Sequence, residues 1–153
     1  MMKLQILNTR DVKELKKIIS DVWGVDFELE VVFLKSEKRD RIYAVNRDIA
    51  DIDLSKLRID TLGLYFGTWN VKGFRLSFEG SRIIGPLAKK NVAELNEKQR
   101  DEWIKGQDIE FDSSSKEFLI IKCGADYFGC GKMREGMLYN FVPKTRRLSV
   151  VAD

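Results

Sequence analysis

The sequence predicts an α+β protein in two parts, a small β-α-β-β unit over residues 1–57 and a mixed-strand barrel over residues 58–153. Three observations support this prediction. Apolar residues recur at helical spacing between Val12 and Trp23. Apolar and polar residues alternate in many short runs after residue 58, as expected of strands. Short strands accompanied by two short helices favour a small, partly closed barrel.

The first part begins with a strand and a helix. Residues 2–7 form the expected strand, and Asn8 or Thr9 offers the N-cap of a helix that Gly24 ends. Two further strands are expected over residues 27–34 and 41–45, with a charged turn between them. Residues 48–57 loosely close the unit.

The second part places two short helices among strands. Ser81 is expected to cap a helix through Ile84, and Asn96 with Gln99 resembles a capping box for a helix that Gly106 ends. Strands are expected over residues 62–67, 74–78, 118–121, 127–133, 137–141 and 148–152.

Composition restricts the chemistry of the chain. Histidine is absent and there are two cysteines, Cys123 and Cys130, so Ser-His and Cys-His nucleophile pairs are excluded and a zinc site lacks its usual ligands. We therefore expect no metal, no cofactor and two free thiols that pack as small apolar groups. No apolar run approaches the roughly 18 residues that span a bilayer, and the first residues are too polar for a signal peptide. The expected location is the cytoplasm, without membrane contact.

Positive charge is concentrated near the C-terminus. The formal net charge is +3, and the whole excess lies in residues 58–153. Residues 128–148 contain one acid, Glu135, and five basic residues: Lys132, Arg134, Lys144, Arg146 and Arg147. Such a segment suits contact with a polyanion, and a solvated basic turn would give the same pattern.

Four groups of residues carry a family resemblance. In chain order they are Gly63-Leu64-Tyr65-Phe66-Gly67, Gly73-Phe74-Arg75-Leu76-Ser77, Glu79-Gly80-Ser81, and Gly129-Cys130-Gly131 with Asn140-Phe141-Val142-Pro143-Lys144-Thr145-Arg146-Arg147. Together they resemble a PUA-like domain, most closely the module attached to RNA cytosine methyltransferases of the NOL/Sun group and its stand-alone archaeal versions. The resemblance covers residues 58–153. It implies a pseudo-barrel that binds structured RNA, commonly tRNA or rRNA.

The resemblance also implies a binding surface. In PUA domains RNA meets the first short helix, its glycine loop and a strand near the C-terminus. Carried onto this sequence, that surface comprises Gly80, Ser81, Arg82, Lys132, Arg134, Lys144, Arg146 and Arg147. Asn140 joins it as a polar residue among aromatic neighbours, and its alternative role is to satisfy a buried carbonyl.

The glycines and aromatic residues of the basic segment each allow two interpretations. Gly129-Cys130-Gly131 lies between strands with no helix after it, which favours a bulge or a close backbone approach over nucleotide binding. At most one of four aromatic residues is expected to be exposed and able to stack on an unpaired base: Tyr127, Phe128, Tyr139 and Phe141.

The sequence departs from the methyltransferases at the catalytic position. Their catalytic cysteine follows proline, whereas Cys123 follows Lys122 and Cys130 follows Gly129. We therefore expect a non-catalytic RNA-binding protein in rRNA or tRNA maturation or modification, partnered by an RNA-modifying enzyme such as a methyltransferase or by a ribosome-assembly protein. Two alternatives stay open, a small ribonuclease that uses Lys132 with Tyr139 or Asp126, and a protein-binding scaffold.

Overall fold

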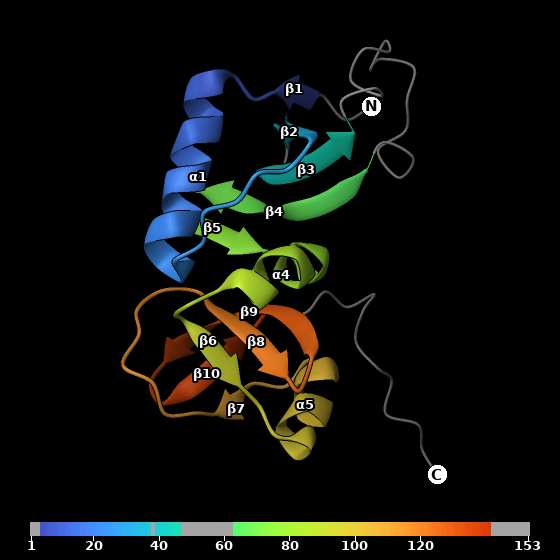
Figure 1. Cartoon of the computed structure of the whole chain (residues 1–153). Helices are drawn as coiled ribbons and strands as arrows, with labels where there is room; N and C mark the ends of the chain where they lie inside the picture. Colours follow the sequence, from blue (N-terminus) through green and yellow to red (C-terminus); the bar gives the residue numbers. More distant parts are fainter. Residues whose placement is uncertain (1–3, 38, 47–62, 142–153) are drawn as a thin grey trace.

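Two five-stranded sheets form the framework of the molecule, in the strand orders β1-β2-β3-β4-β5 and β6-β8-β9-β10-β7. The computed structural model describes residues 4–37, 39–46 and 63–141. In Figure 1 the first sheet and α1 occupy the upper half, the second sheet and α5 the lower half, and α4 lies between them. The α+β class is confirmed, and one sheet curls into the half-barrel expected of a PUA-like pseudo-barrel.

The first sheet is antiparallel throughout, and the helix α1 follows its first strand. Its elements are β1 (Leu4–Ile6), α1 (Thr9–Trp23), β2 (Val31–Ser36), β3 (Arg41–Asn46), β4 (Leu64–Asn70) and β5 (Gly73–Leu76). The predicted caps of α1 are present, since Asn8 Oδ1 accepts a hydrogen bond from Asp11 N at 2.8 Å and Gly24 adopts φ +69° at the C-cap.

The second sheet contains one parallel pair, β6 with β8, and antiparallel pairs elsewhere. Its elements and the helices around it are α4 (Phe78–Ile84), the 3-10 turn η2 (Gly85–Leu87), β6 (Val92–Glu94), α5 (Glu97–Ile104), β7 (Ile109–Glu110), β8 (Leu119–Cys123), β9 (Asp126–Arg134) and β10 (Met137–Asn140). The capping box of α5 is confirmed, because Asn96 and Gln99 exchange side-chain and backbone hydrogen bonds.

The helix α4 begins earlier than the sequence predicts. Ser77, not Ser81, is its N-cap, and Ser77 Oγ accepts a hydrogen bond from Gly80 N at 2.9 Å. Phe78 therefore starts the helix instead of continuing the preceding strand. Ser81 lies inside the helix and is fully buried.

The expected division at residue 57 falls within residues 47–62, outside the described part of the chain, as does the strand expected over residues 148–152. Strands β4 and β5 follow that division in sequence but belong to the first sheet, since β4 pairs with β3 and β5 pairs with β4. Strands β6 and β7 were not predicted, because each is too short to show an alternating pattern.

A shared core joins the two sheets. Trp23 at the end of α1 is fully buried, and its indole Nε1 donates to Phe118 O, just before β8, at 3.0 Å. The main apolar cluster contains Phe74 from the first sheet together with Ile120 and Cys130 from the second. A second apolar cluster surrounds the side chain of Trp103 in α5. Among the described helices, none has both the length and the apolar composition needed to cross a bilayer.

Candidate nucleic-acid interface

A groove of about 470 Å³ lies between two β-hairpins, one from each sheet. On the β4–β5 hairpin, strand alternation buries Phe74 and Leu76 and directs Arg75 to the opposite face, where it lines the groove. Thr68, the register partner of Arg75 on β4, lines the groove beside it.

The β9–β10 hairpin forms the other wall by the same alternation. Lys132 and Arg134 of β9 and Tyr139 of β10 line the groove. Leu138 and Asn140, which alternate with Tyr139, are buried on the other face of the hairpin. Each hairpin thus presents one polar or aromatic face to the groove and one face to a core.

The groove is strongly basic. Its four cationic side chains are Lys72, Arg75, Lys132 and Arg134, and no carboxylate is among its described lining residues. None of the four forms an ion pair with a carboxylate in the described ranges. Uncompensated cations on the walls of a concave surface create a positive potential that favours an anionic ligand. We call this surface the basic groove.

Aromatic rings alternate with the cations in the basic groove. Lys132 Nζ lies 4.7 Å from the ring centroid of Phe118, the Arg134 guanidinium 4.7 Å from Tyr139, and the Arg75 guanidinium 4.3 Å from Phe141. These distances are within the range of cation–π attraction, which holds each cation in place.

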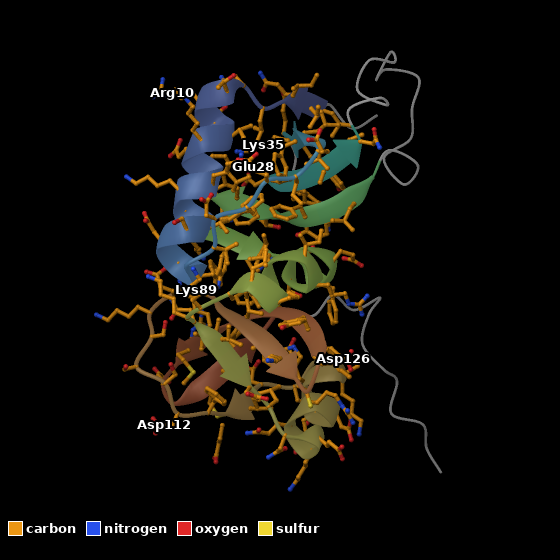
Figure 2. All side chains as sticks on the ribbon, viewed as in Figure 1. Arg10, Glu28, Lys35, Lys89, Asp112 and Asp126 are labelled. Carbon is orange, nitrogen blue, oxygen red and sulfur yellow. The ribbon has the colours of Figure 1, made fainter. Side chains whose placement is uncertain are left out.

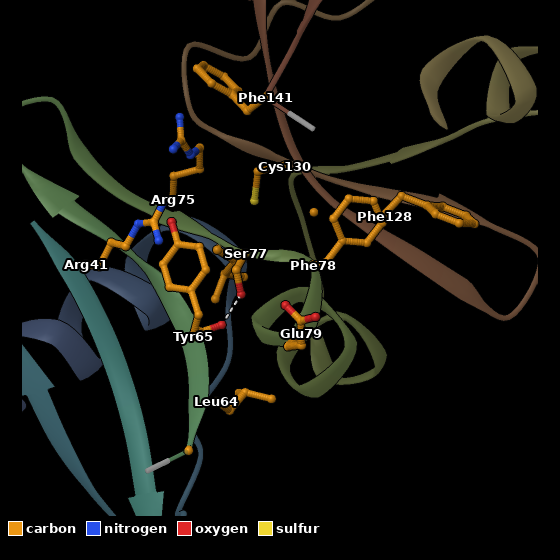
Figure 3. A pocket seen from close by; sticks show the side chains of 13 residues that line it. Arg41, Leu64, Tyr65, Arg75, Ser77, Phe78, Glu79, Phe128, Cys130 and Phe141 are labelled. Atoms are coloured by element: carbon orange, nitrogen blue, oxygen red, sulfur yellow. Dashed lines mark hydrogen bonds between the residues drawn. The ribbon is translucent and has the colours of Figure 1, made fainter. Parts of the chain in front are cut away.

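A second hollow of about 620 Å³ adjoins the basic groove and shares Arg75 and Phe141 with it. Figure 3 shows Arg41, Tyr65 and Arg75 on one side of this hollow, with Phe141 next to Arg75 and Phe128 on the other side. The Arg41 guanidinium lies 4.9 Å from the Tyr65 ring, so the cation–π arrangement of the groove continues here. We call this second surface the α4 hollow because Phe78 and Glu79 of α4 line it.

The thiol of Cys130 lines the α4 hollow without being chemically available. Burial raises the pKa of this thiol to about 12, and the opposing effects of the Leu76 backbone and of Arg75 are weaker. Cys123 and Cys130 are both buried free cysteines, as the sequence predicts.

Comparison with known proteins finds a family similarity in the second half of the chain. Residues 90–148 match the family model described as the methyltransferase RsmF PUA domain. This part of the chain is similar to the PUA-like module of such methyltransferases, and we call it the PUA-like part of the chain. The chain is also 24% identical over 137 residues to ribosomal RNA small subunit methyltransferase F of Shewanella oneidensis, an alignment that covers 88% of this chain.

The alignment has two consequences for the PUA-like part of the chain. The alignment is 137 residues long, which is longer than the segment 58–153. The similarity therefore extends into the first part of the chain, beyond the region indicated by the sequence motifs. The chain spans only 28% of the length of that relative. The groove joins both parts, because the PUA-like part of the chain supplies Lys132, Arg134 and three rings, whereas Lys72 and Arg75 precede the matched residues.

Of the residues predicted to contact RNA, two lie in the basic groove, Lys132 and Arg134. Arg82 is exposed on α4 but lines neither the groove nor the α4 hollow. Lys144, Arg146 and Arg147 lie outside the described residues.

Three predicted contacts are corrected, because these residues are buried and make contacts within the protein. Asn140 Nδ2 donates to Trp103 O at 2.8 Å and to Gln107 O at 2.9 Å, which is the buried-carbonyl role. Ser81 Oγ donates to a carbonyl within α4 and accepts from a backbone N–H of β9. Gly80 is pressed against β4, where an added Cβ would lie 2.1 Å from the carbonyl oxygen of Phe66.

Sequence reasoning missed Lys72, Arg75 and Phe118 as part of the site. The sequence did indicate that Arg75 lies on the open face of a strand, since it alternates with Phe74 and Leu76 in a half-buried strand. No local pattern indicated Lys72 or Phe118, because only the packing of the two sheets brings them to the groove.

Two predictions about the basic segment are confirmed. Of its four aromatic residues only Tyr139 is exposed, with 37% of its surface accessible. Phe128 and Gly129 together oppose one residue of β8, which is a β-bulge. Gly129 adopts φ +77°, and its N–H donates to Ser81 Oγ at 2.9 Å.

The residues of the ribonuclease alternative are only partly together. Lys132 and Tyr139 are register partners on β9 and β10. Asp126 pairs with Cys123 at the other end of β9, at the edge of the lower half in Figure 2. Asp126 and Lys132 are six positions apart along the strand, which corresponds to a separation of about 20 Å. No group of three metal-ligating acids or cysteines occurs within the described ranges.

Proposed function

We propose that this chain is a non-catalytic RNA-binding protein of rRNA or tRNA modification, and that the basic groove is its RNA-contacting surface. The observation that carries the proposal is the set of four cations without carboxylate partners in the described part of the groove. The match to the RsmF PUA domain and the relative named as a ribosomal RNA methyltransferase support RNA as the anion.

The family match guides the proposed role of this chain. The family model describes a PUA domain alone, and the chain aligns with 28% of the methyltransferase. We propose that this chain contributes RNA binding and acts with a partner, an RNA-modifying enzyme or a ribosome-assembly protein. Arg82, Lys144, Arg146 and Arg147 are retained as proposed RNA contacts, and the proposed place of action is the cytoplasm.

Salt-dependent RNA binding tests the proposal. The double variant Lys72→Ala/Lys132→Ala is compared with Lys13→Ala/Lys17→Ala, which removes the same charge from exposed positions on α1. Filter binding to tRNA and to a small-subunit rRNA fragment is measured at several salt concentrations. Each lost phosphate contact reduces the slope of log K against log salt by about 0.7–0.9.

The groove variant is expected to lose affinity and about 1.4–1.8 of slope if both contacts are lost, whereas the α1 variant keeps the wild-type slope. Equal affinity and slope for the two variants, with the fold intact by circular dichroism, would show that the groove is not the RNA-contacting surface. Absence of binding to either RNA would favour the protein-binding scaffold.

A ribonuclease is the second candidate because Lys132 and Tyr139 face each other across β9 and β10. Incubation of the protein with end-labelled transcripts, with and without a divalent metal, distinguishes the two functions. A non-catalytic RNA-binding protein leaves the transcripts intact. Discrete cleavage products that Lys132→Ala abolishes would establish the enzyme instead.

A further inference from the structure

We propose that the basic groove takes an unpaired stretch of RNA, with one base stacked on Tyr139 and the adjoining phosphates held by Lys132 and Arg75. This inference rests on the proposed RNA binding and specifies the form of RNA that fits the groove. It is argued from the exposure of Tyr139, from the spacing of the cations and from what a duplex would leave unused.

Tyr139 is exceptional on the surface of the described residues. The other exposed large apolar residues there are Ile6, Val71 and Leu87, so Tyr139 is the single aromatic side chain among them. Phe141 packs against its ring in a T-shaped arrangement, with ring centroids 5.0 Å apart, and the Arg134 guanidinium lies over one face of the ring, which leaves the other face for a base. An aromatic ring held in place loses little conformational freedom when a base stacks on it.

The cationic side chains are spaced along the groove so that each ring has a cation beside it that can bind a phosphate. Lys132 and Arg134 are two residues apart on one face of β9, a separation of about 6.6 Å. Arg75 projects from the opposite wall. A positively charged groove with aromatic rings at intervals is the arrangement that binds single strands with little sequence preference.

A duplex would use only half of these features. Its phosphates could reach the cations, but its bases are paired and stacked on one another, and double-stranded RNA is recognised through phosphates, 2′-hydroxyls and shape. Tyr139 would then offer its ring to solvent or sugar and gain no stacking. Unpaired bases offer their faces, so they match the rings as well as the cations.

Fluorescence anisotropy provides the test, with a labelled 12-nucleotide oligouridine and a 12-base-pair RNA duplex as the two probes. The wild-type protein is expected to prefer the single strand. Tyr139→Leu keeps an apolar side chain but removes the π face, and it is expected to reduce the preference for the single strand by at least about fivefold. Tyr139→Phe restores the preference, and Leu87→Ala, exposed away from the groove, keeps it.

Photo-crosslinking gives an independent measurement. Oligouridine that carries 5-iodouridine is irradiated with the protein, and the joined peptide is identified by mass spectrometry. The proposal expects the crosslink at Tyr139.

The outcomes separate this inference from the function it rests on. Equal affinity for duplex and single strand, unchanged by Tyr139→Leu, overturns the stacking site; the proposed RNA binding survives if Lys72→Ala/Lys132→Ala still weakens both probes. If neither probe nor the tRNA and rRNA fragments bind, both proposals fail.

Discussion

Ser36 and Ser81 are fully buried serines with opposite hydrogen bonding. Ser81 Oγ donates to Phe78 O at 2.7 Å and accepts from Gly129 N at 2.9 Å, so it ties α4 to the bulge of β9. Ser36 Oγ finds no hydrogen-bond partner among the described residues. The same side chain therefore contributes stability in one place and costs it in the other.

Ser81→Ala is expected to lower the free energy of unfolding by about 1–3 kcal/mol, because the N–H of Gly129 stays buried without a partner. Ser36→Ala is expected to be neutral or stabilising, since it removes an unsatisfied hydroxyl. Urea denaturation followed by tryptophan fluorescence measures both. Equal losses in the two variants would contradict the role assigned to the Ser81 hydroxyl.

Cys130 makes stability depend on pH at the alkaline end. Its folded-state pKa is raised by burial from 9.0 to about 12, so as pH rises the unfolded chain releases this proton before the folded protein does. The stabilising contribution is complete below about pH 9 and is lost as pH rises toward 12. The free energy of unfolding is therefore expected to fall more steeply between pH 9 and pH 10.5 in the wild type than in Cys130→Ala. Parallel pH profiles would refute this assignment.

At the scale of elements, α4 depends on a close approach to β4 that only glycine permits. A methyl group at Gly80 would lie 2.1 Å from the carbonyl oxygen of Phe66 and 3.1 Å from a methyl group of Leu76. Gly80→Ala is expected to destabilise the protein by about 1–3 kcal/mol or more, as overpacking does. Arg82→Ala, exposed on the same helix, is expected to stay within about 0.5 kcal/mol of wild type in thermal denaturation.

The helices show how far local sequence predicts an element. The sequence offered Asn8 or Thr9 as the N-cap of α1, Gly24 as its end and Asn96 as the N-cap of α5. Asn8, Gly24 and Asn96 hold these positions, because each acts on backbone groups within a few residues. Helix α4 was placed too late because Phe78 continues the alternation of Phe74 and Leu76 in the sequence. Packing on β4, which no local pattern contains, decides that Phe78 begins a helix.

At the scale of the whole molecule, the two sheets are expected to unfold together. Trp23 from the first half donates to Phe118 O of the second, and Asn91 Nδ2 donates to Val22 O at 2.6 Å. Far-ultraviolet circular dichroism and tryptophan fluorescence should give coincident urea transitions. The separate fragments 1–77 and 78–153 are expected to be unfolded, because each loses part of the shared apolar cluster. A folded fragment would show that the halves are independent domains.

The same joining of sheets explains why the site was only half predictable. Lys132 and Arg134 were identified from local charge, and their place in the groove follows from the alternation of β9. Lys72 and Arg75 lie at least 57 residues earlier in the chain and face them only after the halves pack. Local patterns indicate which face of a strand a side chain occupies, and tertiary packing determines which faces meet.

The bulge at Phe128 and Gly129 constrains the length of the chain. Side chains alternate along a strand, so deleting Gly129 would shift the register of β9 relative to β8 and exchange the two faces of everything beyond it. Lys132 and Arg134 would leave the groove and point into the apolar cluster around Trp103. Insertions and deletions should therefore accumulate among homologues in the turns at Gly124 and Gly136, while the number of residues between those turns stays fixed.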